Sequence, residues 1–178
     1  MKREKILYTV AIALLAVALV AALIYKRPLD IRQITGVAEP ETISLHIERL
    51  DPATGLKVKE LTLSAGDEGF DALLGQLDEL EFRRPPANLF RIALPFLGDA
   101  DSGEKDCEDG QFRRLDVTLS ASDWAGEYAP NQVSFQVDQW YYRDSSRSQT
   151  LALAVVDGEE IGQDLCAQLW EQAQWVNY

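Results

Sequence analysis

The longest apolar run of the chain lies near its start. Residues 6–25 contain no charged side chain, and their only polar residues are Thr9 and two tyrosines. At about 1.5 Å per helical residue, a helix of this length would extend roughly 30 Å, the thickness of the hydrocarbon core of a bilayer. We therefore predict a transmembrane helix over 6–25, a cytoplasmic tail over 1–5 and a stalk over 26–41.

A cleaved signal peptide is the alternative interpretation of the same run, because basic residues before an apolar stretch are also typical of such a leader. The run continues straight to Lys26 without a polar stretch before a cleavage site, which favours an uncleaved anchor. The basic start also favours export of the large C-terminal domain. We expect a single-pass protein of the cell membrane, which contacts the lipid bilayer through 6–25 and whose domain, 42–178, is extracytoplasmic.

Two strands are predicted at the start of this domain. Apolar and polar residues alternate from Thr42, which is typical of a half-buried strand. Turn-forming residues at 51–55 lead to a second strand at 56–64, so the two should form a hairpin. The apolar phase changes in the second strand near Lys59, and this predicts a β-bulge there.

An amphipathic helix and a long insertion come next. Apolar residues at helical spacing between Phe70 and Leu80 predict the helix. The next connection, residues 85–110, is too long for an ordinary loop, so we predict an insertion with local structure of its own. Its first half is apolar and should pack against the domain through Leu89, Phe90, Ile92, Leu94, Phe96 and Leu97.

The remainder of the chain predicts three more strands and a closing helix. The strands are expected at 112–121, 132–143 and 150–156, and the helix at 159–173. The predicted fold class is therefore α+β: an N-terminal transmembrane helix, then one mainly antiparallel sheet with helices on one face, in the order β-β-α-insertion-β-β-β-α.

This layout of basic start, single span, short stalk and acidic domain, ending in VVDGEEIGQDLCAQLWEQ, resembles the uncharacterised membrane-anchored extracytoplasmic domains of gut-dwelling Gram-positive bacteria. The resemblance implies a protein of the cell envelope. It implies no functional residues, since those domains have no assigned activity.

Charge and motifs exclude several classes of function. The chain has 17 basic and 29 acidic residues, a net charge of -12, which argues against a nucleic-acid partner. It contains no phosphate-binding glycine loop, no dinucleotide fingerprint and no nucleophile elbow. We therefore predict no cofactor and no enzymatic activity.

Cys107 and Cys166 are the first candidate pair of functional residues. In an exported domain they would form a disulfide that ties the insertion to the last helix. The alternative is a buried thiol at Cys166 and a free, exposed one at Cys107.

His46 and the acidic residues of 99–109 are weaker candidates. His46 lies in the polar phase of the first strand. It is a candidate acid/base group, and the alternative is that it belongs to a solvated polar face of the strand. The spacing of the acidic residues does not fit a calcium-binding loop, so no metal site is predicted.

Aromatic residues complete the candidates. Trp140 and Tyr142 fall in the polar phase of the predicted strand 132–143, where they would be exposed and able to contact a partner. The alternative is that they are core residues.

The sequence thus predicts a noncatalytic module that binds an envelope protein or glycan. The predicted contact residues are Leu89, Phe90, Phe96, Trp140 and Tyr142. An envelope hydrolase based on carboxylates, and a structural subunit of a membrane complex, are the alternatives.

Overall fold

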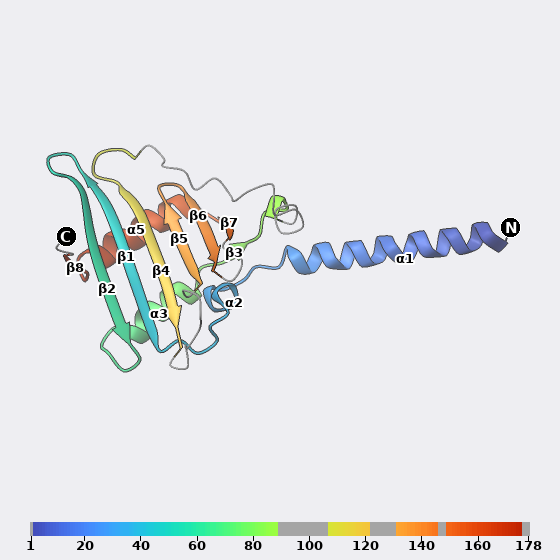
Figure 1. Ribbon diagram of the computed structural model, residues 1–178, viewed down its shortest axis with the longest axis horizontal. Coiled ribbons are helices and arrows are strands. Elements are labelled where there is room, and N and C mark those ends of the chain that lie inside the picture. The colour runs from blue at the N-terminus through green and yellow to red at the C-terminus, as the bar shows by residue number, and fades with distance from the viewer. Residues whose placement is uncertain (1, 89–106, 122–130, 146–148, 176–178) are drawn as a thin grey trace.

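The strands of this protein form a single antiparallel sheet (Figure 1). The computed structural model describes residues 2–88, 107–121, 131–145 and 149–175. Within them the eight-stranded sheet has the order β3-β7-β6-β5-β4-β1-β2-β8. The strands are β1 (Thr42–Asp51), β2 (Gly55–Ser64), β3 (Phe82–Arg83), β4 (Phe112–Ser120), β5 (Gln132–Gln136), β6 (Gln139–Asp144), β7 (Gln149–Val155) and β8 (Gln174–Trp175).

The helices α3 (Phe70–Asp78) and α5 (Gly158–Trp170) lie behind the sheet in Figure 1 and cover one of its faces. The hydrophobic core lies between these helices and the sheet. On the central strands the buried side chains alternate, as a sheet with one covered face requires. They include Ile43, Leu45 and Ile47 of β1, Leu115, Val117 and Leu119 of β4, and Val133 and Phe135 of β5.

Helix α5 lies close to the sheet at Gly162. A Cβ atom built on Gly162 would be 2.4 Å from the Phe135 ring, closer than real carbon contacts allow. One turn earlier, the Trp140 indole donates its Nε1–H to the Gly158 carbonyl oxygen at 2.8 Å. The absence of a side chain at Gly162 therefore sets the distance between helix and sheet.

A short helix, α2 (Ile31–Thr35), lies in the segment that the sequence predicts as a stalk. Asp30 caps its first turn, since the Asp30 carboxylate accepts the Gln33 backbone N–H at 2.7 Å. Ile31 and Ile34 are buried in the core. Residues within 26–41 thus contribute to the folded domain.

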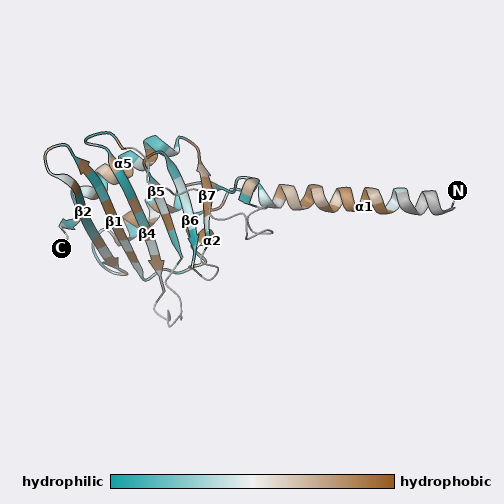
Figure 2. Ribbon diagram, turned by 45° about the horizontal axis from the view of Figure 1, so that its top comes forward, coloured by the Kyte–Doolittle hydropathy of each residue, from teal (hydrophilic) through white to brown (hydrophobic). Residues whose placement is uncertain are grey.

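Helix α1 (Lys2–Tyr25) extends away from the domain (Figure 2). Its described apolar side chains between Tyr8 and Leu23 are exposed. In the described part of the chain, no helix has both the length and the apolarity needed to cross a bilayer. This finding contradicts the predicted membrane span over 6–25.

The predicted fold class therefore needs correction. The structure is mainly one antiparallel sheet of eight strands with a few helices, and the described part of the N-terminal helix is exposed. Five strands were expected. The predicted strand at 132–143 is a hairpin of two strands, and the two-residue strands β3 and β8 are too short to show an alternating pattern.

Candidate functional site: a small pocket beside β6 and β7

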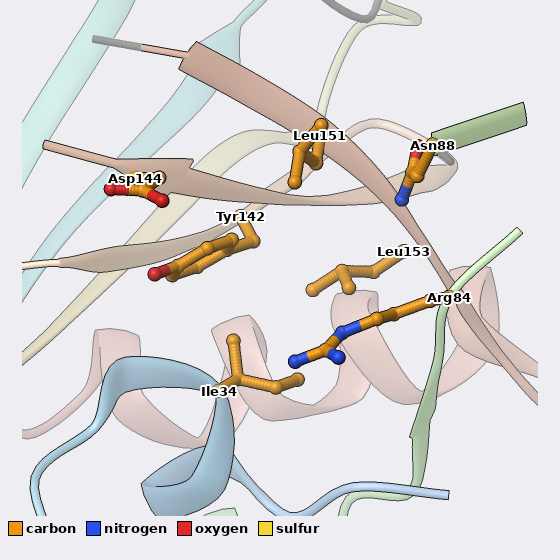
Figure 3. A pocket seen from close by; sticks show the side chains of 7 residues that line it. All are labelled: Ile34, Arg84, Asn88, Tyr142, Asp144, Leu151 and Leu153. Atoms are coloured by element: carbon orange, nitrogen blue, oxygen red, sulfur yellow. The ribbon is translucent and has the colours of Figure 1, made fainter. Parts of the chain in front are cut away.

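A pocket of about 250 Å³ lies near the β7 side of the sheet, on the face that the helices cover (Figure 3). Its volume is just below the roughly 300–1,000 Å³ of most small-molecule sites. It would therefore enclose only a small molecule or one end of a larger one. The lining residues are Ile34 from α2, Arg84 and Asn88 from the segment after β3, Tyr142 and Asp144 from β6, and Leu151 and Leu153 from β7.

The register of the sheet places the wall of this pocket. Tyr142 pairs with Leu151 across β6 and β7, and Trp140 pairs with Leu153. Paired residues point to the same face of a sheet, as do residues two apart along one strand. Tyr142, Leu151 and Leu153 therefore share the helix-covered face.

Asn88 contributes a fixed side chain to the wall of the pocket. Its side chain is 1% exposed, and its Nδ2 donates to the Ala152 carbonyl oxygen at 2.6 Å. That bond sets the orientation of the amide, because the opposite orientation would place two oxygen atoms against each other. Among the residues that the structure describes, Asn88 Oδ1 has no hydrogen-bond partner. A buried acceptor without a partner costs about 1–3 kcal/mol. Less than 1 Å² of this oxygen is accessible, so Asn88 shapes the wall of the pocket and does not offer its acceptor to a molecule inside it.

Arg84 contributes a positive charge. Figure 3 shows its guanidinium extending into the pocket. Within the described residues Arg84 has no carboxylate at ion-pair distance, whereas Arg32 pairs with Asp78 and Arg114 pairs with Asp116. Among the described residues, therefore, no carboxylate has to be released before the Arg84 guanidinium binds an anion.

The remaining polar groups lie across the pocket. In Figure 3, Tyr142 and Asp144 stand on the side opposite Asn88, and the Arg84 guanidinium reaches below Leu153 toward Ile34. The pocket thus has a cation that reaches into it, a carboxylate and a phenol on one side, and aliphatic side chains in its wall.

The end of α1 holds the segment that carries Arg84. The Tyr25 hydroxyl donates to the Pro85 carbonyl oxygen at 3.0 Å. Burial raises the pKa of Tyr25, and the positive charge of Arg84 nearby opposes that rise. On the other side of Arg84, Phe82 exchanges two backbone hydrogen bonds with Leu29, both 2.9 Å long. The backbone on both sides of Arg84 is therefore tied to the start of the domain.

His46 lies on the opposite, outer face of the sheet. Its ring nitrogens lie 3.2 Å from Glu48 Oε1 and 3.2 Å from Glu60 Oε1. The hydrogen bond to Glu48 raises the pKa of His46, burial lowers it, and the hydrogen bond to Glu60 raises it again, with a net rise. The same bond to His46 lowers the pKa of Glu48. Across the described residues, no group of three or more His, Cys, Asp or Glu side chains could hold a metal ion.

The two cysteines are free thiols, so the predicted disulfide is wrong. Cys166 points into the core from α5, where burial raises the pKa of its thiol to about 12. Cys107 precedes β4, and its Sγ lies 3.8 Å from the Gln111 carbonyl oxygen. Burial raises the pKa of Cys107 as well. Each sulfur thus contacts its own surroundings and not the other cysteine.

The predicted contact residues have different positions. Leu89, Phe90 and Phe96 lie outside the described residues. Trp140 is 1% exposed, and its ring lies 5.5 Å from that of Phe82 and 5.3 Å from that of Phe135, measured between centroids. Of the two described contact residues, Tyr142 lines the pocket and Trp140 does not.

Arg84 and Asn88 are absent from the candidates that the sequence suggests. Both come after β3, and a two-residue strand leaves no pattern that would place them beside β7. A hairpin recognised at residues 137–138 would have placed Tyr142 on the covered face, but it would not have indicated Arg84 or Asn88.

Comparisons with known proteins give no match: no family model matches the sequence, no curated protein matches it, and no solved structure matches it. Fold and site therefore define the protein only by class. It is a single-sheet antiparallel domain with a small pocket of mixed polarity.

Proposed function

We propose that this protein is a noncatalytic binding module and that the pocket of Arg84, Asn88 and Tyr142 is its ligand site. The observation that carries this proposal is the Arg84 guanidinium. It extends into the pocket (Figure 3), and among the described residues it has no carboxylate at ion-pair distance. A ligand with an anionic group would provide that partner.

The fixed positions of the lining residues support binding. Asn88 is held by Ala152, Tyr142 lies within a paired strand, and the Tyr25 hydroxyl holds Pro85 next to Arg84. A site whose groups are already in place loses less conformational entropy when a ligand enters.

The envelope hydrolase is less well supported. Acid/base hydrolysis needs two titratable groups that face one substrate. The pocket is lined by one carboxylate, Asp144, while His46 and its glutamates lie on the other face of the sheet. The proposed activity is therefore binding.

We also propose that the module lies outside the cytoplasm, as the basic start and the apolar run after it favour. Cys107 is half-buried and Cys166 is buried, so a membrane-impermeant maleimide should react with Cys107. Labelling of Cys107 in intact cells is the expected result. Labelling that begins only after lysis would contradict this location.

A thermal-shift screen of the full-length protein tests the binding proposal. The panel contains amino acids, simple carboxylates, sugars and amines, and the matched variants are Arg84→Gln and Arg83→Gln. Arg83 is the exposed neighbour of Arg84 and does not line the pocket. At a concentration of about 100 Kd a bound ligand adds about 2.7 kcal/mol to the stability, which raises the melting temperature by several degrees.

We expect at least one compound to stabilise the wild type and Arg83→Gln but not Arg84→Gln. The proposal is wrong if no compound stabilises the wild type, or if Arg84→Gln responds to every compound as the wild type does.

A further inference from the structure

We infer that the ligand is an aliphatic monocarboxylate, which is a molecule with one carboxylate group and an apolar chain bonded to it. This inference rests on the proposed function, because it names the ligand class of the same pocket. Three properties of the pocket carry it: the number of cations in its lining, the surroundings of the guanidinium and the volume.

The number of cations favours a single negative charge on the ligand. Among the described residues that line the pocket, Arg84 is the one cation, and Asp144 adds a carboxylate. The chain has a net charge of -12, so a second negative charge on a ligand is repelled and has no second cation to bind. A phosphate group carries about -1.5 to -2 at pH 7, whereas a carboxylate carries one negative charge. A monocarboxylate therefore matches the lining better than a phosphate or a dicarboxylate.

The chemistry of the Arg84 side chain also suits a carboxylate. A guanidinium presents two parallel N–H donors that match the two carboxylate oxygens, and such charge-assisted bonds are about twice as strong as neutral ones. Within the described residues, no carboxylate of the protein lies at ion-pair distance from this guanidinium. Both donors can therefore bind the ligand.

The surroundings of the guanidinium favour an apolar group next to the carboxylate. In Figure 3 the guanidinium reaches below Leu153 toward Ile34, and Leu151 lines the same pocket. Leu151 pairs with Tyr142 across β6 and β7, so the leucine and the aromatic ring are neighbours on this face. The atoms that follow a carboxylate bound to Arg84 therefore lie beside apolar side chains. Each CH₂ group buried there strengthens binding by roughly fourfold, which corresponds to about 0.8 kcal/mol.

The volume of the pocket limits how much of the ligand it encloses. About 250 Å³ is just below the range of most small-molecule sites. Two sources share the chemistry that fits this volume, namely a short free acid and the carboxyl end of a longer aliphatic chain. The two sources differ only in the length of the chain beyond the pocket, so the dependence of affinity on chain length distinguishes them.

Isothermal titration of the full-length protein tests the inference with pentanoate, which has both features, and with ligands that change one of them. Pentanamide lacks the charge, acetate lacks the chain, pentanedioate adds a second carboxylate, and inorganic phosphate tests the other kind of anion. Decanoate keeps both features and extends the chain. The protein variants are Arg84→Gln and the matched control Arg83→Gln, since Arg83 is exposed and does not line the pocket.

We expect pentanoate, decanoate or both to bind, and the other four ligands to bind at least about tenfold more weakly than the tighter of these two. Arg84→Gln should weaken that binding by a similar factor, and Arg83→Gln should leave it unchanged. Tighter binding of decanoate indicates the end of a longer chain, and equal or weaker binding indicates a short free acid. The Arg84 variant also separates the pocket from the exposed apolar side chains of α1, where a long chain would bind without Arg84.

The ligand class is wrong if neither pentanoate nor decanoate binds in an Arg84-dependent way, or if pentanamide, acetate, pentanedioate or phosphate binds as tightly as they do. The proposed function survives that result when another compound, such as phosphate or pentanedioate, still binds in an Arg84-dependent way. Both proposals fail when no compound of this series or of the thermal-shift screen depends on Arg84.

Discussion

Lys59 is a charged residue in the buried phase of β2. It is 8% exposed, and its Nζ donates to the Trp170 carbonyl oxygen at 2.6 Å. The same Nζ lies 4.7 Å from the centroid of the Trp170 ring and 5.0 Å from that of Trp175. The hydrogen bond and the two aromatic faces replace the water that the ammonium loses on burial.

Lys59 also explains the change of apolar phase in the second strand. The β1–β2 ladder pairs without interruption from Thr42↔Ser64 to Asp51↔Gly55, so the bulge that we predicted near Lys59 is absent from this ladder. A lysine that occupies a core position looks like a phase change in the sequence. Its aromatic partners are more than 100 positions away in the chain, since the bond to Trp170 spans 111 residues.

We expect Lys59→Met to lower the free energy of unfolding by about 1–2 kcal/mol, because it removes the hydrogen bond and the cation–π contacts. Lys57→Met is the matched control. Lys57 is half-exposed, lies 5.7 Å from the Trp175 centroid and pairs with Asp51 at the surface, so its loss should cost about 0.2–1 kcal/mol, less than the loss of Lys59. Urea denaturation measures both values, and equal effects of the two substitutions would contradict the role given to Lys59.

His46 makes the stability of the domain depend on pH. Its pKa is raised in the folded state, so protonated His46 stabilises the fold. This contribution is fully present below the ordinary pKa of 6.5 and is lost as the pH rises through the higher pKa of the folded state. The contribution of Glu48 depends on pH in the opposite direction, because its pKa is lowered in the folded state. Ionised Glu48 stabilises the fold above its ordinary pKa of 4.5, and this stabilisation is lost as the pH falls through its folded-state pKa. Both shifts describe one ion pair.

We therefore expect the free energy of unfolding to fall between pH 6 and pH 8, by roughly 0.5–1 kcal/mol for a partly exposed pair. His46 is the single histidine of the chain, so His46→Gln should remove most of this slope. Urea denaturation of both proteins at the two pH values is the measurement. A slope that His46→Gln leaves unchanged would show that another group causes it.

At the scale of elements, the contact between α5 and β5 depends on Gly162. We expect Gly162→Ala to lower the free energy of unfolding by about 1–3 kcal/mol, because the new methyl group overlaps the buried Phe135 ring. Gly75→Ala in α3 is the control, since a Cβ there meets nothing within 4 Å. It should instead add about 0.5–1 kcal/mol through the higher helix propensity of alanine. Thermal or urea unfolding distinguishes these opposite signs, and equal signs would contradict the close approach of α5.

Long alternating strands could be predicted from the sequence, and short elements could not. Strands β1, β2, β4 and β7 lie where the alternation indicates strands. Helix α2 has five residues and β3 has two, so neither contains a full repeat of its pattern. The turn between β5 and β6 could not be predicted from the sequence. Val137 adopts a φ of 55° there, a left-handed conformation that a β-branched residue rarely takes.

The turn between β5 and β6 also changes what could be predicted of the site. If 132–143 is taken as a single strand, as the sequence predicts, Trp140 and Tyr142 fall in its polar phase. With a two-residue turn they share the face of Val133 and Phe135, because Val133 pairs with Tyr142 and Phe135 with Trp140. Trp140 therefore enters the core, and Tyr142 lines the pocket beside it.

At the scale of the whole molecule, an acidic domain carries an apolar helix that extends away from it (Figures 1 and 2). The two parts meet where Tyr25 binds Pro85 and Leu29 pairs with Phe82. Arg84 lies between Phe82 and Pro85, so the pocket is next to this junction. Our central claim is that this pocket binds a small ligand with an anionic group through Arg84.

NMR titration of the isotope-labelled full-length protein with the most stabilising compound of the thermal-shift screen tests this claim most directly. We expect the Asn88 side-chain amide and the Arg84 Nε–H signals to shift together with one Kd. The side-chain amide of Gln163, which bonds to Phe112 and Val137, lies outside the pocket lining and should stay unchanged. Signals of Asn88 and Arg84 that do not move, or that move no more than that of Gln163, would contradict the claim.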